Sequence, residues 1–143
     1  MQKYYKWRIS RHKSFNLLKN FIKEAEKLGV IDYPIHIKID TGMHRLGFEP
    51  EDAEELIQIL QGQNSLKVRS VFSHLVGADE EKFDEFTKKQ IEIFDAFSKK
   101  IENAFEHKII KHILNSAGIE RFSEFQYDMV RLGIGHYGIS AKN

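Results

Sequence analysis

Residues 35–40 read Ile35-His36-Ile37-Lys38-Ile39-Asp40, a stretch in which isoleucines alternate with polar side chains. A period of two is typical of a β-strand with one apolar and one polar face. A doubly wound parallel sheet has apolar side chains on both faces, because helices cover both of them. In a (β/α) barrel the apolar face lies against the helices, and polar side chains point into the lumen near the catalytic rim. The alternation therefore favours a barrel, with the doubly wound sheet as the alternative.

Helical patterns lie on both sides of this strand. Apolar residues three or four positions apart predict helices over residues 15–28, 51–60 and 83–105. The longest of them carries a stripe at helical spacing made of Phe83, Phe86, Gln90, Phe94, Phe97, Ile101 and Phe105. Such a stripe predicts a helix that packs one side against the core.

Further strand patterns alternate with these helices. Runs rich in β-branched residues predict strands over 68–75, 109–115 and 129–134, with a loop at 116–123. This order predicts a parallel sheet with crossover helices. Because a closed barrel takes eight strands and about 250 residues, we expect an α/β fold in the form of a partial (β/α) barrel, with about four parallel strands.

The composition limits the kinds of function. With 143 residues, 41% of them hydrophobic and 30% charged, the chain suits one globular domain. It has no cysteine, which excludes disulfides, a thiolate nucleophile and zinc sites built on sulfur. A formal net charge of +1 offers no field for nucleic acid or an anionic membrane, and uncharged stretches such as 56–66 are too short to span a bilayer. We expect a soluble, cytoplasmic protein without a metal site, whose partner is a small molecule or a protein.

The first residues differ from the rest in charge. Residues 1–13 contain five basic side chains and no acidic one, namely Lys3, Lys6, Arg8, Arg11 and Lys13. They lack the apolar segment of a secretory signal, which makes a targeting peptide the less favoured interpretation. We therefore expect a basic leader at 1–13, the domain at 14–140 and a short tail at 141–143.

Four charged or titratable residues are predicted at the ends of strands, where parallel barrels collect their active groups. Lys38 could be an amine nucleophile once burial lowers its pKa, but a structural lysine paired with an acid is favoured. His74 could be a base or stack on a ring, although a lone histidine is more often a core residue. Arg45 and Arg131 could bind anions or a ring nitrogen, and Arg45 could equally lie at the surface.

Two loops near the end of the chain suggest a phosphate site. They read Asn115-Ser116-Ala117-Gly118 and Arg131-Leu132-Gly133-Ile134-Gly135. A hydroxyl and accessible backbone N–H groups after the last strands are the usual phosphate site of such barrels. The pattern predicts a ligand with a phosphate, and the alternative is that the glycines serve only turns and close packing.

Four blocks in order resemble bacterial alanine racemase, a barrel enzyme that uses pyridoxal 5'-phosphate (PLP). The longest, His36-Ile37-Lys38-Ile39-Asp40-Thr41-Gly42-Met43-His44-Arg45-Leu46-Gly47-Phe48, closely resembles the family signature. The others are Val71-Phe72-Ser73-His74-Leu75 with Asp79, Leu114-Asn115-Ser116-Ala117, and Val130-Arg131-Leu132-Gly133-Ile134 ending in Tyr137-Gly138. The resemblance covers roughly residues 15–140. It implies strands five to eight of the family barrel, from an isomerase that interconverts L- and D-alanine for the cell wall.

The resemblance implies a set of cofactor contacts. Arg131 would donate to the pyridine nitrogen of PLP and, having no acceptor, would leave that nitrogen unprotonated. This weakens the electron sink of the ring and discourages transamination. Ser116, with the backbone of Gly133 and Ile134, would hold the phosphate, and His74 would pack beside the ring. Asn115, from the same block, completes the implied cofactor set.

The resemblance also implies groups on the substrate side. Arg45 would contact the phenolic oxygen of the cofactor and orient the substrate. Lys38 resembles a family position that is often carbamylated, and this change would turn a cation into an anion suited to pair with Arg45. With His74, these residues form the implied catalytic set. A Schiff-base enzyme that uses Lys38 is the less favoured alternative.

The lysine that binds PLP covalently and the tyrosine base of the family lie in regions that the resemblance does not cover. Moving a proton between the two faces of Cα needs both groups. We therefore expect a racemase fragment that is inactive alone, and the alternative is a non-catalytic PLP or phosphate-binding module. Single-domain PLP-binding barrels are disfavoured by the fuller racemase signature. Because unpaired edge strands are usually covered, we also expect the chain to form a homo-oligomer.

Overall fold

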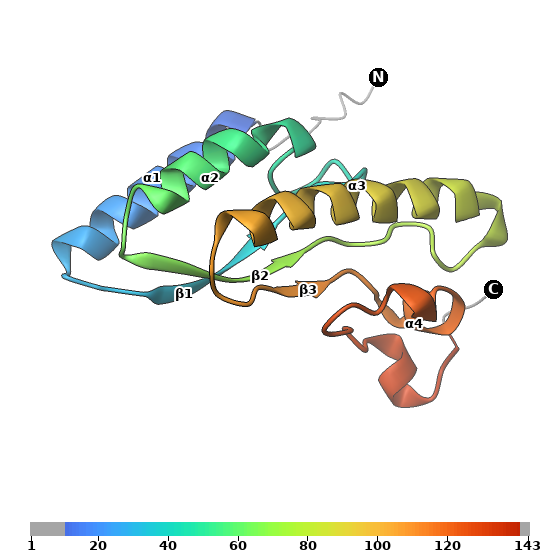
Figure 1. The fold of residues 1–143 in the computed structure, drawn as a ribbon. Coiled ribbons are helices and arrows are strands. Elements are labelled where there is room, and N and C mark those ends of the chain that lie inside the picture. Colours follow the sequence, from blue (N-terminus) through green and yellow to red (C-terminus); the bar gives the residue numbers. More distant parts are fainter. Residues whose placement is uncertain (1–10, 141–143) are drawn as a thin grey trace, which may run out of the picture.

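The computed structural model describes residues 11–140, an α/β arrangement of parallel strands and crossover helices (Figure 1). In chain order the elements are α1 (Arg11–Lys27), β1 (Tyr33–Lys38), α2 (Ala53–Gln61), β2 (Leu66–Phe72), α3 (Asp84–Ala104), β3 (Ile110–His112) and α4 (Ser116–Arg121). Short 3-10 helices lie at η1 (Pro50–Asp52), η2 (Glu81–Phe83), η3 (Ser123–Phe125) and η4 (Ile134–Tyr137). The predicted leader lies outside the described residues except for 11–13, which belong to α1, and the predicted tail lies outside them too.

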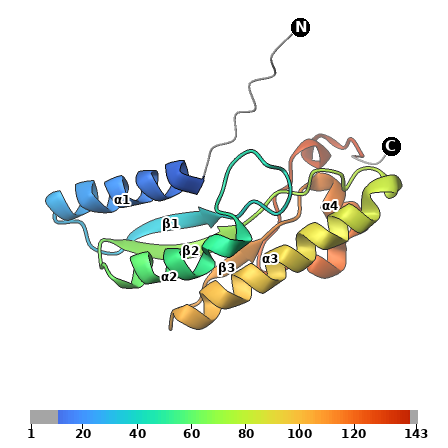
Figure 2. The ribbon, with the colours of Figure 1, turned by 90° about the horizontal axis from the view of Figure 1, so that it is seen from above.

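The sheet has its strands in the order β1-β2-β3, all parallel, as the crossover pattern predicts. Helices α1, α2 and α3 all cover the same face of this sheet (Figures 1 and 2). In and just after β1, Ile37 and Ile39 are buried under these helices, whereas His36 is exposed and Lys38 half-buried. The sheet therefore has one covered and one polar face, as in a barrel, and the doubly wound alternative is wrong.

The core lies between the sheet and the three covering helices. Helix α1 contributes Phe15, Leu18, Ile22 and Ala25, and the stripe of α3 contributes Gln90, Phe94, Phe97 and Ile101. Each large apolar side chain removed from water here stabilises the fold by about 1.5–3 kcal/mol. Gly29 ends α1 with a φ of +66°, a left-handed conformation that glycine adopts without a steric penalty.

The predicted fourth strand over 129–134 is wrong. Residues 129–133 have no regular secondary structure, and η4 begins at Ile134. It donates two backbone hydrogen bonds to the chain around β3, from Asp128 N to Lys111 O and from Arg131 N to Leu114 O. Further along, the N–H groups of Gly133 and Gly135 bond to a side chain, so they form no ladder. The strand predicted over 35–40 has the expected length but lies two residues earlier, at 33–38, and the strands predicted over 68–75 and 109–115 are shorter than expected. Within the predicted loop, 116–121 forms the short helix α4.

Candidate functional site

The predicted charged residues gather at the carboxyl-terminal edge of the sheet. Lys38 is the last residue of β1, and His74 follows the end of β2 by two residues. Arg45 lies in the loop after β1, and Arg131 lies on the extended segment beside β3. Arg131, Lys38 and Arg45 are near enough to His74 to lower the pKa of its imidazole. Four residues that are far apart in sequence therefore form one cationic cluster.

The pKa values of two groups in this cluster are perturbed. Burial is the main cause that lowers the pKa of Lys38, and the charge of Arg45 lowers it further. The carboxylate of Asp40 acts in the opposite direction. Burial and then the charge of Arg131 lower the pKa of His74, which favours its neutral form. The cluster has more positive than negative charge and suits an anionic ligand.

A tight loop over residues 40–48 holds Arg45 at the rim. Oδ1 of Asp40 accepts hydrogen bonds from the N–H groups of Gly42, at 2.9 Å, and His44, at 3.0 Å. Gly47 has a φ of +122°, and a Cβ there would lie 2.8 Å from backbone atoms of the strand end. The loop returns to β1 because Phe48 N donates to Lys38 O at 2.9 Å. Arg45 itself is exposed.

The guanidinium of Arg131 is held by four acceptors. Nη2 donates to Ser73 O at 2.6 Å and to Ile113 O at 3.3 Å, while Nη1 donates to Nδ1 and to the backbone oxygen of His112. The guanidinium also lies over the ring of Phe72, 5.5 Å from its centroid. Among the N–H donors of this guanidinium, only Nε–H has no hydrogen-bond partner within residues 11–140. The side chain is thus fixed and has one donor to offer to a ligand.

Two residues after Arg131, backbone N–H donors begin to converge on the side chain of Ser116. Oγ of Ser116, a buried hydroxyl, accepts from Gly133 N at 2.9 Å and from Gly135 N at 3.2 Å. A Cβ on either glycine would lie 3.5 Å from the same oxygen, in ordinary van der Waals contact, so both glycines lie directly beside the Ser116 hydroxyl. Ile134, between the two glycines, is exposed. The two N–H groups thus hold this loop against the Ser116 hydroxyl, and the contacts of Ser116, Gly133 and Ile134 with a phosphate stay a prediction.

Asn115 fixes the neighbouring backbone. Its Oδ1 accepts from Gly118 N at 3.0 Å and caps α4, and its Nδ2 donates to Leu75 O at 3.0 Å. Both ends of the carboxamide therefore bond to the protein. Asn115 joins the ends of β2 and β3 and sets the position of Ser116; its predicted contact with a cofactor stays a prediction.

Comparison with known proteins identifies the family. Residues 12–141 match the sequence profile of the alanine racemase N-terminal domain. The chain belongs to this family. It is 38% identical over 127 residues to an alanine racemase of Prochlorococcus marinus, covering 87% of this chain and 32% of the relative. It is 45% identical over 109 residues to an alanine racemase of Fusobacterium nucleatum, covering 74% and 29%.

Solved alanine racemase structures have the same fold in this region. The alanine racemase of D-cycloserine-producing Streptomyces lavendulae superposes with a TM-score of 0.76 at 29% identity, over 87% of this chain and 33% of that one. The chain thus spans about a third of the length of the relatives it matches. Of the described helices, none is long and apolar enough to cross a membrane. Over the same residues, no three His, Asp or Glu side chains gather into a metal site.

The alanine racemase family depends on PLP, and the residues present here fit that cofactor. The free Nε–H of Arg131 suits an unprotonated ring nitrogen, since a guanidinium can only donate. Ser116 and the backbone of Gly133 and Ile134 suit a phosphate if a phosphate oxygen replaces Ser116 Oγ as the acceptor of Gly133 N–H. Both ends of PLP therefore have matching donors on one stretch of chain.

Sequence reasoning missed two residues that hold this site together. His112 accepts a hydrogen bond from Arg131 and stacks on Phe72, with ring centroids 5.1 Å apart and an interplanar angle of 4°. Gln90 lies fully buried in α3 and bonds to the ends of β1 and β2. The only signal for Gln90 was its place as a polar residue in an apolar stripe.

Proposed function

We propose that this chain forms the cofactor-binding part of a PLP-dependent alanine racemase, which interconverts L- and D-alanine. The observation that carries the proposal is the pairing of Arg131, with one free guanidinium donor, and the N–H groups of Gly133 and Gly135 around Ser116 Oγ. The free donor of Arg131 matches the ring nitrogen of PLP, and a phosphate oxygen would take the place of Ser116 Oγ as the acceptor of the backbone N–H groups. The matched relatives, all longer than this chain, support alanine as the substrate.

The cofactor and the chain have separate tasks in this proposal. When bound, PLP withdraws electrons from the substrate and makes its Cα proton acidic. Arg131 would keep the ring nitrogen unprotonated, because burial and its four acceptors hold the guanidinium in place. Neutral His74 would pack beside the ring without adding a further positive charge. These contacts limit the electron withdrawal, which favours racemisation over transamination.

Arg45 and Lys38 would act on the substrate side. The exposed guanidinium of Arg45 can bind the phenolic oxygen of the cofactor and orient the substrate carboxylate. The lowered pKa of Lys38 increases its fraction of neutral amine, the form that carbamylates. A carbamate there would pair with Arg45 and steady it. Lys38 is therefore a support for Arg45 in this proposal, and the covalent lysine lies elsewhere.

Binding of pyridoxamine 5'-phosphate tests the cofactor site, because this amine cannot form a Schiff base with lysine. We expect it to bind tighter than pyridoxamine, which lacks the phosphate, in a calorimetric titration. Ser116→Ala should weaken binding of the phosphate form about tenfold, since one hydrogen bond to a charged group is worth about 1.5–3 kcal/mol. Equal affinity for both amines, or no binding of either, would contradict the proposal.

Reduction with borohydride after incubation with PLP tests the role of Lys38. We expect the intact mass and a peptide digest to show no specific adduct at Lys38. Such an adduct would instead favour the alternative in which Lys38 is the Schiff-base residue. Lys38→Met, which keeps the length of the side chain, is the matched control for the digest.

We also propose that the protein acts in the cytoplasm as a homo-oligomer. The similarity to bacterial alanine racemases supports the location, and the open edge of β1 supports association. Cell fractionation with an antibody to the chain tests the location, and a membrane or secreted pool would contradict it.

A further inference from the structure

A buried polar network joins α3 to the ends of β1 and β2. At its centre Gln90, 0% exposed, donates through Nε2 to Thr41 Oγ1 at 3.1 Å and to His74 O at 3.0 Å. Its Oε1 accepts from Val76 N at 3.1 Å. Thr41 opens the loop that carries Arg45. One side chain thus bonds to both segments that deliver the cationic cluster.

The direction of every hydrogen bond in this network is determined. Ser73 donates its hydroxyl hydrogen to Ile39 O at 2.8 Å, so Ser73 Oγ must accept from Thr41 at 2.8 Å. The hydrogen of Thr41 is then used, and its oxygen accepts from Gln90. Both amide hydrogens of Gln90 and its oxygen are therefore engaged. Only an amide at this position satisfies two acceptors and one donor at once.

The packing around Gln90 is equally tight. A Cβ added at Gly42 would lie 2.9 Å from the ring of Phe86 and 3.6 Å from Cγ of Gln90. Helix α3 therefore lies against the loop after β1 with no space between them. Loss of the Gln90 bonds would leave buried acceptors without donors, and the loop ends would have to move to reach water.

We propose that Gln90 is a positioning residue, which sets His74 and the Arg45 loop at a fixed separation around the cofactor. It touches neither substrate nor cofactor and acts through Thr41 and the backbone of residues 74–76. The role toward the cofactor rests on the proposed function, but the geometry of the two strand ends does not.

Gln90→Met tests this proposal, because methionine keeps the length and volume of glutamine but has no amide. Thr87→Val is the matched control, since Thr87 is equally buried in α3 and its hydroxyl has no hydrogen-bond partner within residues 11–140. The first readout is the NMR titration of the His74 ring in the full chain. It reports on the nearby charges of Lys38, Arg45 and Arg131 without any ligand.

In the wild type, we expect His74 to titrate below the ordinary value of 6.5. In Gln90→Met the midpoint should move up toward that value, because the His74 ring becomes less buried and lies farther from the cationic loop, and Thr87→Val should match the wild type. Superimposable titrations of folded Gln90→Met and wild type would overturn the proposal. If Gln90→Met does not fold, Thr41→Val takes its place, because it breaks only the bonds to the end of β1. We expect this variant to shift the His74 midpoint in the same direction but by less. No shift in Thr41→Val would overturn the proposal.

The second readout is the affinity for pyridoxamine 5'-phosphate. Gln90→Met should raise its Kd about tenfold, the effect of one lost buried hydrogen bond, while Thr87→Val leaves it unchanged. If the wild type does not bind this amine, the proposed function fails and the titration of His74 still decides the role of Gln90. If the wild type binds and Gln90→Met binds equally well, only the role of Gln90 is wrong.

Discussion

His112 controls the most strongly held side chain of the site. Burial, followed by the charges of Arg131 and His36, lowers the pKa of His112 from its ordinary value of 6.5 to about 4. The ring is therefore neutral at pH 7, and its Nδ1 can accept from Arg131 Nη1. Protonation would place an N–H against the guanidinium and break this contact. Arg131 thus keeps this one of its four acceptors only while His112 stays neutral.

A pH dependence of stability follows from this shift. As the pH falls from about 6.5 toward about 4, the unfolded chain takes up a proton that folded His112 refuses, so the free energy of unfolding decreases. His112→Asn keeps an acceptor near Nδ1 but cannot titrate, and should flatten this part of the profile in urea unfolding. An identical slope in both proteins would contradict the role of His112. His112→Phe keeps the stacking and should cost about 1–3 kcal/mol at neutral pH, because a donor of Arg131 loses its acceptor.

At the residue scale, the sequence predicts where a site residue lies relative to a strand better than it predicts the hydrogen-bond partners of that residue. Lys38 and His74 lie at strand ends as expected, because the carboxyl ends of parallel strands meet at one edge of a sheet. The bonds of Arg131 to Ser73 and His112 join residues 58 and 19 positions apart, respectively. No local pattern indicates such contacts. They depend on how three strand ends pack together.

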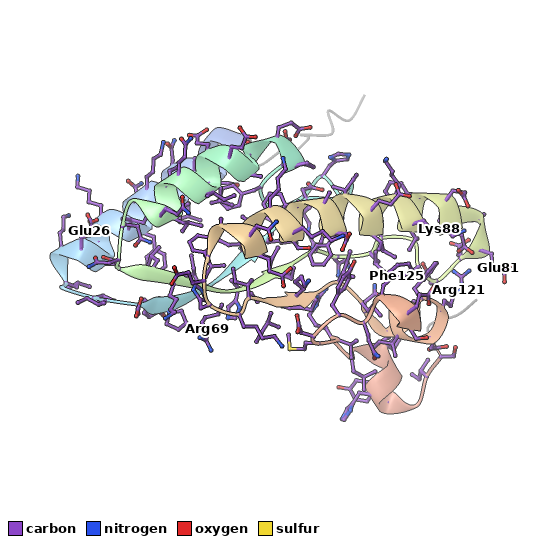
Figure 3. The ribbon with its side chains drawn as sticks, viewed as in Figure 1. Glu26, Arg69, Glu81, Lys88, Arg121 and Phe125 are labelled. Carbon is purple, nitrogen blue, oxygen red and sulfur yellow. The ribbon has the colours of Figure 1, made fainter. Side chains whose placement is uncertain are left out.

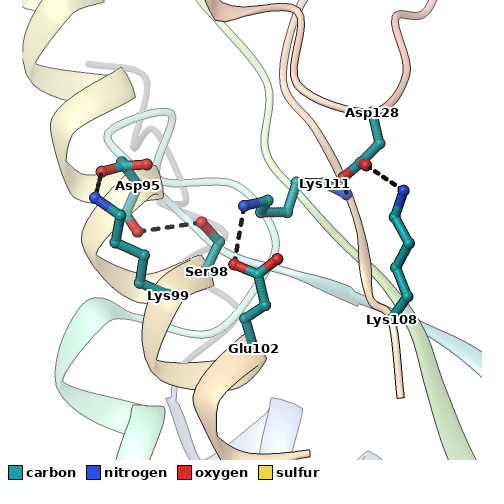
Figure 4. A network of polar contacts seen from close by, with 7 residues as sticks. All are labelled: Asp95, Ser98, Lys99, Glu102, Lys108, Lys111 and Asp128. Atoms are coloured by element: carbon teal, nitrogen blue, oxygen red, sulfur yellow. Dashed lines mark hydrogen bonds and ion pairs between the residues drawn. The ribbon is translucent and has the colours of Figure 1, made fainter. Parts of the chain in front are cut away.

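At the scale of elements, an ionic network places the segment that carries Arg131 (Figure 4). Asp128 accepts from Lys111 N at 2.9 Å and pairs with Lys108 at 2.9 Å, while Lys111 pairs with Glu102 of α3 at 2.9 Å. The hydrogen bond from Lys108, followed by that from the Lys111 backbone, lowers the pKa of Asp128. Asp128 N also donates to Lys111 O, so one residue binds both backbone groups of Lys111. This anchors the chain just before Arg131.

Asp128→Ala should loosen this anchor. Loss of its hydrogen bonds should cost about 1 kcal/mol and lower the Tm by about 3 °C in a thermal melt. Because the pKa of Asp128 is depressed, its contribution is present at neutral pH and is lost as the pH falls through the depressed value. The matched control is Lys99→Ala, which removes an exposed pair with Asp95 in the same network and should leave the Tm unchanged. Equal melting of both variants would show that Asp128 is no anchor.

The strand predicted over 129–134 is wrong because the periodicity of side chains gives no information on backbone hydrogen-bond partners. Its side chains alternate well enough for a strand, but a strand also needs a neighbour that receives its backbone bonds. Here the Ser116 hydroxyl accepts from Gly133 within this segment, and from Gly135 just after it. The same two hydrogen bonds, which keep this segment from pairing as a strand, also shape the loop of the candidate phosphate site. The failure of the prediction therefore lies at the candidate site itself.

A second set of contacts joins α4 to the segment after β2 and to the start of α3. Arg121 of α4 donates to Ala78 O at 2.8 Å and to Asp84 of α3 at 2.7 Å. Figure 3 shows Arg121 beside the start of α3, near Glu81, and Arg69 on the sheet face away from the helices. The side chain of Arg121 is 11% exposed, so this pair is better shielded from water than the surface pairs of α3. It ties α4, and with it Ser116, to the rest of the fold.

At the scale of the whole molecule, the edge of β1 is open, the edge of β3 receives only the backbone bonds from Asp128 and Arg131, and one apolar segment is exposed. β1 and β3 are the outer strands, and the helices cover only one face. Large side chains along residues 129–139 stay exposed, namely Met129, Val130, Leu132, Ile134, Tyr137 and Ile139. Apolar side chains concentrated next to an open sheet edge mark an association surface. The partial barrel predicted from the strand count thus exposes an apolar surface at residues 129–139 that a partner could cover.

We expect two copies of the chain to associate through residues 129–139. Leu132→Lys, at a side chain 57% exposed, should shift the mass measured by light scattering toward the monomer, because a charge at a buried interface would lose its water. Leu28→Lys is the control, since Leu28 is 79% exposed at the opposite end of the molecule, after α1, and its change should leave the mass distribution as in the wild type. A wild-type chain that stays monomeric at the highest attainable concentration would disprove association. A dimer that Leu132→Lys leaves intact would instead place the interface at the edge of β1, because that is the other open edge of the sheet.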